Sequence, residues 1–388
     1  MNIASLHPRR ALRRPLPAAY CRQHRGGDMA TRHLRILHLS DLHIGKEKPE
    51  NASRVEWVMG DAWAKNLSEI GKDGSIDLVC FTGDLTQSGQ PVQYKDVAER
   101  IEALLQSLNC PRERFFCVPG NHDVDRGIEK TVWRKLRPAL AKSPQAFSDW
   151  FAENPPVAQS IGAPKRPKSR APTGFKDAAR DALLARQKAY RDFLMDANLP
   201  HLLPGQHDNP HPRLGYRRTL DFGFGAPLHI IGFDSAWLAG DDNDASKLHL
   251  TEDQIRRLMA GRDGKPLSGW SIGLIHHPIT DLADGRDAQR LLGHYGLGLL
   301  LHGHQHDPVI ERWADPQTGL HIFAAGCLYE HQNYPNGLLV VDVELPEAQP
   351  LRPRQVWARR WSRRRSEWIN DDDLYTGTEN GRLRLIPD

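Results

Sequence analysis

Five short polar motifs, each directly after a short apolar run, constrain this sequence more than any other feature. They are Asp41-Leu42-His43, Gly83-Asp84, Gly120-Asn121-His122-Asp123, His276-His277-Pro278 and Gly303-His304-Gln305-His306. The apolar runs before them are 36–39, 76–81, 115–118, 271–275 and 297–301, and each has the length of a buried strand. Strands of one sheet end along one edge, so we expect motifs that are distant in sequence to converge there.

The residue types in these motifs are those that hold metal ions. Asp, Asn and His supply oxygen and nitrogen ligands that Mn, Fe, Zn and Ni accept, and the motifs contain no thiolate. Two cations roughly 3.5–4 Å apart need at least one bridging carboxylate, and Asp84 is the natural candidate. Such a pair can clamp a phosphate and generate a nucleophile from water. The motifs therefore predict a two-metal site for phosphate esters.

The ordered set D-x-H, G-D, G-N-H-D, H-H-P and G-H-x-H resembles the calcineurin-like metallophosphoesterase superfamily. The resemblance extends roughly from Leu34 to Asp307, and all five motifs are present without substitution. It implies seven metal ligands. These are Asp41, His43 and His306 for one ion, Asn121, His276 and His304 for the other, and Asp84 as the bridge. On family grounds Mn and Fe are favoured as the two ions, and Zn and Ni are also compatible.

The resemblance gives the remaining motif residues a catalytic role. His122 would bind the phosphate or act as a general acid, and Asp123 would orient its ring. The choice of His276 over His277 as a ligand rests on the family pattern alone. Taken singly, the motifs also fit strand-end turns or a buried histidine pair. His38 and His302 lie within apolar runs, and we expect them to be core histidines rather than ligands.

Composition places the chain among ordinary globular proteins and argues against a membrane partner. The chain has 388 residues, of which 39% are hydrophobic and 26% charged. Its apolar runs are shorter than the ~18–20 residues of a membrane span. The five cysteines form no C-x-x-C pair, and Cys80 and Cys117 lie in predicted buried strands. We therefore expect a cytoplasmic protein without disulfides.

The positive charge of the chain is concentrated near its start. The net charge is +4, but residues 1–33 contain seven arginines and only one acidic residue, Asp28. The pI of 8.8 is therefore weak support for a nucleic-acid partner. We expect residues 1–30 to be a disordered basic extension, with Met29 as a candidate initiator. A transit segment is the alternative, because such segments are also rich in Arg and poor in acidic residues.

The order of the predicted elements indicates an α/β fold. Strands and helices alternate up to residue 118, with helices at 55–70 and 92–107, and this order favours a mainly parallel sheet. Later strands at 309–313, 320–324, 338–343 and 355–361 suggest a second sheet. The predicted fold is two stacked mixed β-sheets flanked by helices, with a largely helical insertion, the form of the resembled family.

The predicted domain boundaries set three segments apart. A metallophosphoesterase domain is expected over 31–345, and a C-terminal strand and extension over 346–388. An insertion at about 127–215 contains a predicted helix at 176–197. It is either a cap over the site or a surface excursion.

Arginines and tryptophans alternate near the C-terminus. Seven arginines between Arg352 and Arg365 are interleaved with Trp357, Trp361 and Trp368. This pattern fits either single-stranded nucleic acid binding or an edge strand with charged exposed positions. The acidic run Asp371-Asp372-Asp373 is a candidate partner for the arginines.

These observations predict a metal-dependent phosphoric ester hydrolase. Its first expected substrates are phosphodiesters such as cyclic nucleotides, because the H-H-P and G-H-x-H motifs resemble those of small bacterial phosphodiesterases. A nuclease and a phosphomonoesterase or protein phosphatase are alternatives. A third alternative is a signalling or defence effector gated by an unknown protein partner, since the middle insertion, the C-terminal extension and segment 234–237 are similar to bacterial phosphoesterases found near signalling ATPases.

Overall fold

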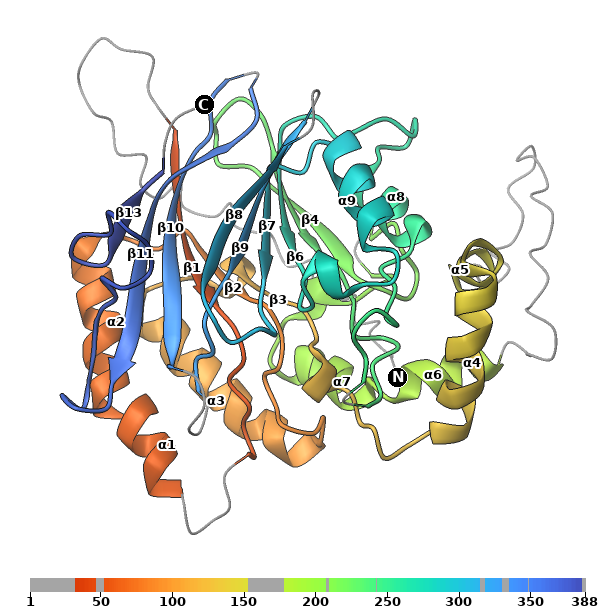
Figure 1. Cartoon of the computed structure of the whole chain (residues 1–388), viewed down its shortest axis with the longest axis horizontal. Coiled ribbons are helices and arrows are strands. Elements are labelled where there is room, and N and C mark those ends of the chain that lie inside the picture. Colours follow the sequence, from red (N-terminus) through yellow and green to blue (C-terminus); the bar gives the residue numbers. More distant parts are fainter. Residues whose placement is uncertain are drawn as a thin grey trace, which may run out of the picture. The chain divides into compact units, whose positions relative to one another are not determined.

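Two mixed β-sheets dominate the part of the chain that the computed structural model describes (Figure 1). The described residues are 32–46, 52–152, 178–206, 209–241, 243–314, 318–329, 335–347 and 349–385, and they belong to a unit that begins at Arg32. The expectation of disorder at residues 1–30 lies outside them.

The first sheet has seven strands in the order β12-β11-β10-β1-β2-β3, with β13 also pairing with β11. Its strands are β1 (His33–Leu39), β2 (Leu78–Phe81), β3 (Phe115–Cys117), β10 (Gly337–Glu344), β11 (Arg352–Ser362), β12 (Glu367–Asn370) and β13 (Arg382–Arg384). Strands β1, β2 and β3 are parallel, while β10 pairs antiparallel with β1 and β11. The expected parallel arrangement of the first three strands is therefore confirmed.

The second sheet has six strands in the order β4-β5-β6-β7-β9-β8. They are β4 (Tyr216–Leu220), β5 (Leu228–Gly232), β6 (Trp270–Leu274), β7 (Leu299–His302), β8 (Val309–Ala314) and β9 (Gly319–Ala324). Strands β5, β6, β7 and β9 are parallel, and β4 and β8 are antiparallel at the edges.

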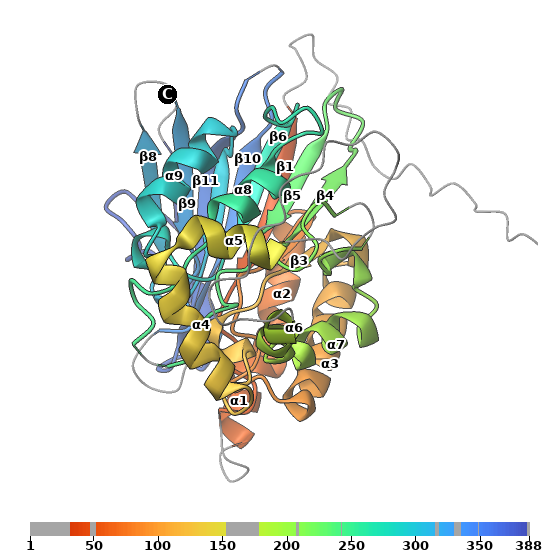
Figure 2. The same ribbon diagram turned by 90° about the vertical axis from the view of Figure 1, so that its right-hand side faces the viewer.

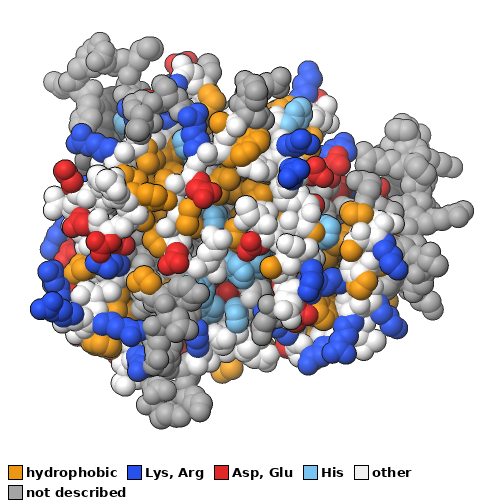
Figure 3. All heavy atoms as spheres, viewed as in Figure 1, with side chains coloured by type: hydrophobic (Ala, Val, Ile, Leu, Met, Phe, Trp, Pro, Cys, Tyr) orange, Lys and Arg blue, Asp and Glu red, His pale blue; other side chains and the backbone are white. Residues whose placement is uncertain are grey.

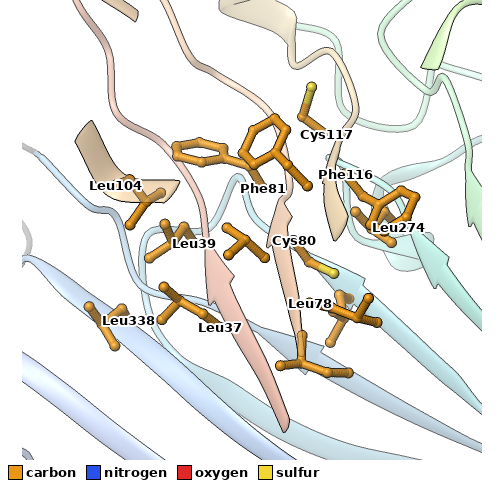
Figure 4. Packing of buried hydrophobic residues seen from close by; sticks show 14 of the residues in the cluster. Leu37, Leu39, Leu78, Cys80, Phe81, Leu104, Phe116, Cys117, Leu274 and Leu338 are labelled. Atoms are coloured by element: carbon orange, nitrogen blue, oxygen red, sulfur yellow. The ribbon is translucent and has the colours of Figure 1, made fainter. Parts of the chain in front are cut away.

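Alternating side chains of the two sheets form a shared core. Ile272 and Leu274 of β6 belong to the same buried cluster as Ile36 of β1 and Leu78 of β2, which are paired in register and share a face of the first sheet. Figure 4 shows Leu274 beside Phe116 of β3 in this layer. In β7, Leu299 and Leu301 belong to this cluster, whereas Leu300 between them belongs to a second cluster on the opposite face of the sheet. This period of two places one apolar face of each sheet against the other.

Helices cover the outer face of each sheet (Figures 1 and 2). Those whose buried side chains join the core of the first sheet are α1 (Ala52–Met59), α2 (Asp61–Asp73), α3 (Pro91–Ser107) and α7 (Lys188–Asp196). Those that join the second cluster are α4 (Lys130–Lys142), α5 (Pro144–Ala152), α6 (Ala178–Ala185), α8 (Glu252–Met259) and α9 (Gly285–His294). The predicted fold of two stacked mixed sheets with flanking helices and a largely helical insertion is confirmed.

Two of the predicted helices are interrupted. The predicted helix at 55–70 divides into α1 and α2 because Gly60 has a ψ of −127°, outside the helical range. The predicted helix at 176–197 divides into α6 and α7 around Gln187. The proposed boundaries of the domain, insertion and extension stay a prediction. Among the described helices, none is long and apolar enough to cross a bilayer.

The arginine- and tryptophan-rich strand is not at the edge of its sheet. Strand β11 lies between β10 on one side and β12 and β13 on the other, so the edge-strand interpretation is wrong. Its Trp357 and Trp361 are buried, and buried Arg359 donates to Asn66 of α2. Arg360 pairs with Asp371 and Asp373, as expected for the acidic run.

Candidate metal centre

The five motifs converge at the carboxyl ends of parallel strands, but these strands belong to two sheets. Strands β1, β2 and β3 of the first sheet and β6 and β7 of the second each end just before a motif. The expectation that all five motifs lie along the edge of one sheet is therefore wrong, because they lie at the edges of two stacked sheets. In Figure 3, histidine side chains gather around an acidic side chain near the centre of the face.

Backbone hydrogen bonds hold the motif loops together. The amide of Asp41 donates to the carbonyl of Gly83 (3.0 Å), and the amide of His43 donates to that of Asp84 (3.0 Å). Across the second sheet, the amide of Gly303 donates to the carbonyl of His276 (3.1 Å). The side chains therefore start from fixed backbone positions.

Five of the seven predicted ligands have left-handed backbone conformations. Their φ angles are 55° at Asp41, 50° at His43, 55° at Asp84, 72° at His304 and 63° at His306. Such angles are uncommon outside glycine and concentrate at functional sites, where the surrounding structure maintains them. This backbone turns the side chains sharply inward at the strand ends.

Two motif glycines allow a close approach of backbone and ligand. A Cβ atom at Gly120 would collide with the carboxylate of Asp84, and one at Gly303 would collide with Ser40 and approach Asp41 Oδ2 (2.7 Å). Any side chain at these positions would displace a predicted ligand.

The first cluster contains Asp41, His43 and His306. The Nε2 atoms of the two histidines are 3.4 Å apart, and Asp41 Oδ1 lies 3.2 Å from His306 Nε2 and 3.7 Å from His43 Nε2. Burial would raise the pKa of Asp41, but the nearby imidazoles of His306 and His276 lower it to about 2. Burial lowers the pKa of His43 to about 4. The cluster thus offers a carboxylate and neutral imidazole, as metal binding requires.

The second cluster is centred on His276. Its Nε2 lies 3.0 Å from Asn121 Oδ1 and 3.3 Å from Asp84 Oδ2, while its Nδ1 lies 2.7 Å from the carbonyl of Thr82. The ring of His304 is 5.1 Å from that of His276. This cluster is linked to the first because the ligand atoms of Asp41, Asp84 and His276 all lie within 4.8 Å of one another.

The hydrogen-bond partners of the Nδ1 atoms distinguish His276 from its neighbour His277. The carbonyl of Thr82 only accepts, so Nδ1 of His276 carries a proton and Nε2 of the neutral ring has a lone pair. The Oγ of Ser235 accepts from the amide of His277 (3.2 Å) and lies 2.8 Å from its Nδ1. The Ser235 hydroxyl can donate to that Nδ1, which places the proton of His277 on Nε2. These contacts support His276 as the metal ligand.

His122 is close to the clusters, but Asp123 does not contact its ring. The ring of His122 lies 4.9 Å from that of His43, and its Nδ1 lies 2.8 Å from the carbonyl of Gln87. The Asp123 carboxylate instead accepts from the amides of Leu85, Thr86 and Gly120 and from the hydroxyls of Thr86 and Tyr94. The expectation that Asp123 orients His122 is therefore wrong, and Gln87 has this position.

The five motifs do not include the groups that orient the histidines. Thr82 acts through its backbone carbonyl, which carries no mark of residue type, and Gln87 places both its backbone carbonyl (2.8 Å) and its side-chain Nε2 (3.3 Å) beside His122 Nδ1. Ser235 is a side chain in a segment that belongs to none of the five motifs, and its position next to His277 emerges only from the pairing of β5 with β6. The predicted core histidines are confirmed, since His38 and His302 are buried and His38 Nε2 lies 3.0 Å from Thr82 Oγ1.

The donor set fits metal ions. The lone pair of His276 Nε2 faces two acceptors, Asn121 Oδ1 and Asp84 Oδ2, so a proton or a cation must lie between them. Although burial alone would lower the pKa of His276, the Asp84 carboxylate raises it to about 9. Oδ1 of buried Asp41 faces the Nε2 atoms of His306 (3.2 Å) and His43 (3.7 Å) in the same way. A metal ion would replace the proton and satisfy these oxygens.

Comparisons with known proteins point to one family. Residues 34–175 match the family described as calcineurin-like phosphoesterase. A metallophosphoesterase-like protein of Bacillus subtilis is 29% identical over 111 residues, which are 29% of this chain and 21% of that protein. A probable cyclic nucleotide phosphodiesterase of Psychrobacter arcticus is 27% identical over 127 residues, covering 31% of this chain and 43% of that protein.

The similarity covers less than half of each of these relatives. Among solved structures, a purple acid phosphatase from yellow lupin has a TM-score of 0.43 at 13% identity, over 85% of this chain and 52% of that one. This overlap is low, so the assignment rests on the sequence match over 34–175 and on the motifs. By this match, residues 34–175 of the chain are similar to the calcineurin-like phosphoesterase family.

Proposed function

We propose that this chain is a dinuclear metal-dependent hydrolase of phosphodiesters, with cyclic nucleotides as the first substrates to examine. The observation that carries the proposal is the joining of the two ligand clusters through Asp41, Asp84 and His276, whose ligand atoms all lie within 4.8 Å of one another. Two adjacent cation sites with carboxylates between them suit a phosphate group, which has several oxygens to neutralise.

Each side chain has a distinct task in this proposal. Asp41, His43 and His306 hold one ion, Asn121, His276 and His304 hold the other, and Asp84 bridges them. The bound ions supply charge neutralisation for the phosphoryl oxygens and a nucleophile from water at neutral pH.

His122 is the proposed proton donor to the leaving oxygen. Its Nδ1–H is directed at the carbonyl of Gln87, so the protonated ring has only its Nε2–H available for the substrate. The backbone amide of His122 donates to Asp84 Oδ1 (2.7 Å) and fixes the ring beside the bridging carboxylate. Asp123 supports this loop through its hydrogen bonds to the amides of Leu85, Thr86 and Gly120.

The names of two relatives support the proposed preference for diesters. Besides the Psychrobacter protein, a second probable cyclic nucleotide phosphodiesterase, from Coxiella burnetii, is 32% identical over 103 residues, covering 26% of this chain and 37% of that protein. A nuclease is the second candidate, because Arg363, Arg364 and Arg365 are exposed on the turn between β11 and β12. Steeply salt-dependent binding to DNA or RNA, lost when these three are replaced, would favour it.

Parallel hydrolysis of two chromogenic esters tests the proposed activity. We expect Mn²⁺-dependent cleavage of bis(p-nitrophenyl) phosphate, little cleavage of p-nitrophenyl phosphate, and no activity with EDTA. Asp84→Asn should reduce turnover at least ~100-fold, because it removes the bridging charge. Asp96→Asn, at an exposed position of α3, is the matched control and should retain full activity.

The opposite ester preference would indicate a phosphatase. Near-normal activity of folded Asp84→Asn would show that catalysis does not depend on the two-metal site.

A further inference from the structure

We propose that a pocket beside the metal centre binds the nucleobase of a phosphodiester substrate. Its lining includes Arg54, Trp57, Tyr329, Asn336, Trp361 and Arg363, and its volume is about 80 Å³. We call it the Trp57 pocket. This inference rests on the proposed function, because it specifies the substrate class of the same site.

The Trp57 pocket is built where three segments meet. Helix α1 supplies Arg54 and Trp57, the chain between β9 and β10 supplies Tyr329 and Asn336, and the end of β11 supplies Trp361. The amide of Trp361 donates to the carbonyl of Asn336 (2.8 Å), which joins two of these segments. The walls therefore belong to the folded core of the first sheet.

The backbone of one pocket residue is joined to the proposed catalytic site. The amide of Tyr329 donates to the carbonyl of Asp41 (3.1 Å), and the amide of Leu328 donates to that of Ser40 (2.8 Å). A residue that lines the pocket is thus hydrogen-bonded to a proposed metal ligand. A substrate with its phosphate at the metals can extend a neighbouring group into the pocket.

Two tryptophans give the pocket an aromatic wall. The ring of Trp57 is packed edge-on against that of Trp361, with centroids 5.4 Å apart and planes at 87°. Trp57 nevertheless remains 44% exposed, which is unusual for so large an apolar side chain. An exposed indole is a stacking surface for a base.

The polar groups of the pocket suit the same ligand. Trp361 is 6% exposed, and its Nε1–H has no hydrogen-bond partner among the described residues. An indole N–H only donates, so it calls for an acceptor such as a base carbonyl or ring nitrogen. Asn336 adds an amide, and Arg54 and Arg363 add positive charge that favours an anionic nucleotide over a neutral molecule.

Two diesters that differ in the presence of a base test the proposal. The first is p-nitrophenyl thymidine 5′-phosphate, and the second is bis(p-nitrophenyl) phosphate, which has no base. We expect Trp57→Ala to lower kcat/KM for the thymidine ester roughly tenfold and to change that for the base-free ester less than about twofold. Trp57→Phe should retain most of the activity, because it preserves an aromatic face.

Arg363 and Arg365 form a matched pair on the same turn. Arg363 lines the pocket and Arg365 does not. Arg363→Gln should lower kcat/KM for the thymidine ester several-fold, mainly through KM, while Arg365→Gln should have no effect. Equal effects of Trp57→Ala on both esters, or none on either, would overturn the inference.

Calorimetry separates failure of the pocket from failure of the proposed function. With Mn²⁺ present, thymidine 5′-monophosphate should bind wild-type protein more tightly than inorganic phosphate, and Trp57→Ala should remove the difference. This result would support the pocket even if neither ester is cleaved. Equal affinities for the two ligands in the wild-type protein would contradict it while leaving ester hydrolysis unaffected.

Discussion

At the residue scale, adjacent histidines have different chemistry because their Nδ1 atoms face different partners. His276 faces a carbonyl that only accepts, whereas His277 faces the hydroxyl of Ser235, which also donates. The first histidine therefore presents a lone pair to the site, whereas the second can present a proton. His277 Nε2 is buried and without a hydrogen-bond partner among the described residues.

This difference predicts opposite results when each histidine is replaced. His276→Ala should lose most of one metal ion per chain, because it removes a ligand held between Asn121 and Asp84. His277→Gln should retain both ions, since its amide still donates a proton from a similar position. Metal content measured by plasma mass spectrometry decides between them. Loss of metal in His277→Gln, with His276→Ala fully loaded, would reverse the assignment.

At the scale of elements, the strand-end loops work because they bring backbone very close to the ligands. Gly120 follows β3, where a Cβ atom would collide with the carboxylate of Asp84. Gly71 lies within α2, where a Cβ atom would meet nothing within 4 Å. The two glycines therefore respond to the same substitution in opposite ways.

We expect Gly120→Ala to displace Asp84 and reduce metal-dependent turnover at least ~100-fold. Gly71→Ala should leave activity unchanged and increase the free energy of unfolding by about 0.5–1 kcal/mol, because alanine is the better helix former. Esterase assays and urea denaturation of both variants provide the measurements. An active Gly120→Ala enzyme would show that this close contact is dispensable.

The elements also show how far the sequence alone could lead. The strands before the five motifs were identifiable from their apolar runs, whereas the seven ligands came from the resemblance of the motifs to a family and stay a prediction. The burial of Arg359 could not be predicted from the sequence, because its partners Asn66 and Glu69 are 293 and 290 residues away in the chain. The same limit applies to the pairing of two sheets at the site, since an apolar run indicates a buried strand but not its neighbours.

At the scale of the whole molecule, stacking of the two sheets creates the site. The first sheet contributes Asp41, Asp84 and Asn121, and the second contributes His276, His304 and His306. Each proposed metal position has ligands from both sheets. The shared core of the sheets thus sets the geometry of the proposed metal centre, and neither sheet alone contains all the proposed ligands of either ion.

Anomalous diffraction from crystals grown with Mn²⁺ tests this account most directly. We predict two peaks, one among Asp41, His43 and His306 and the other among Asn121, His276 and His304, with Asp84 between them. A single peak, or a peak bound by His276, His277 and His304 without Asp84, would contradict the two-metal centre.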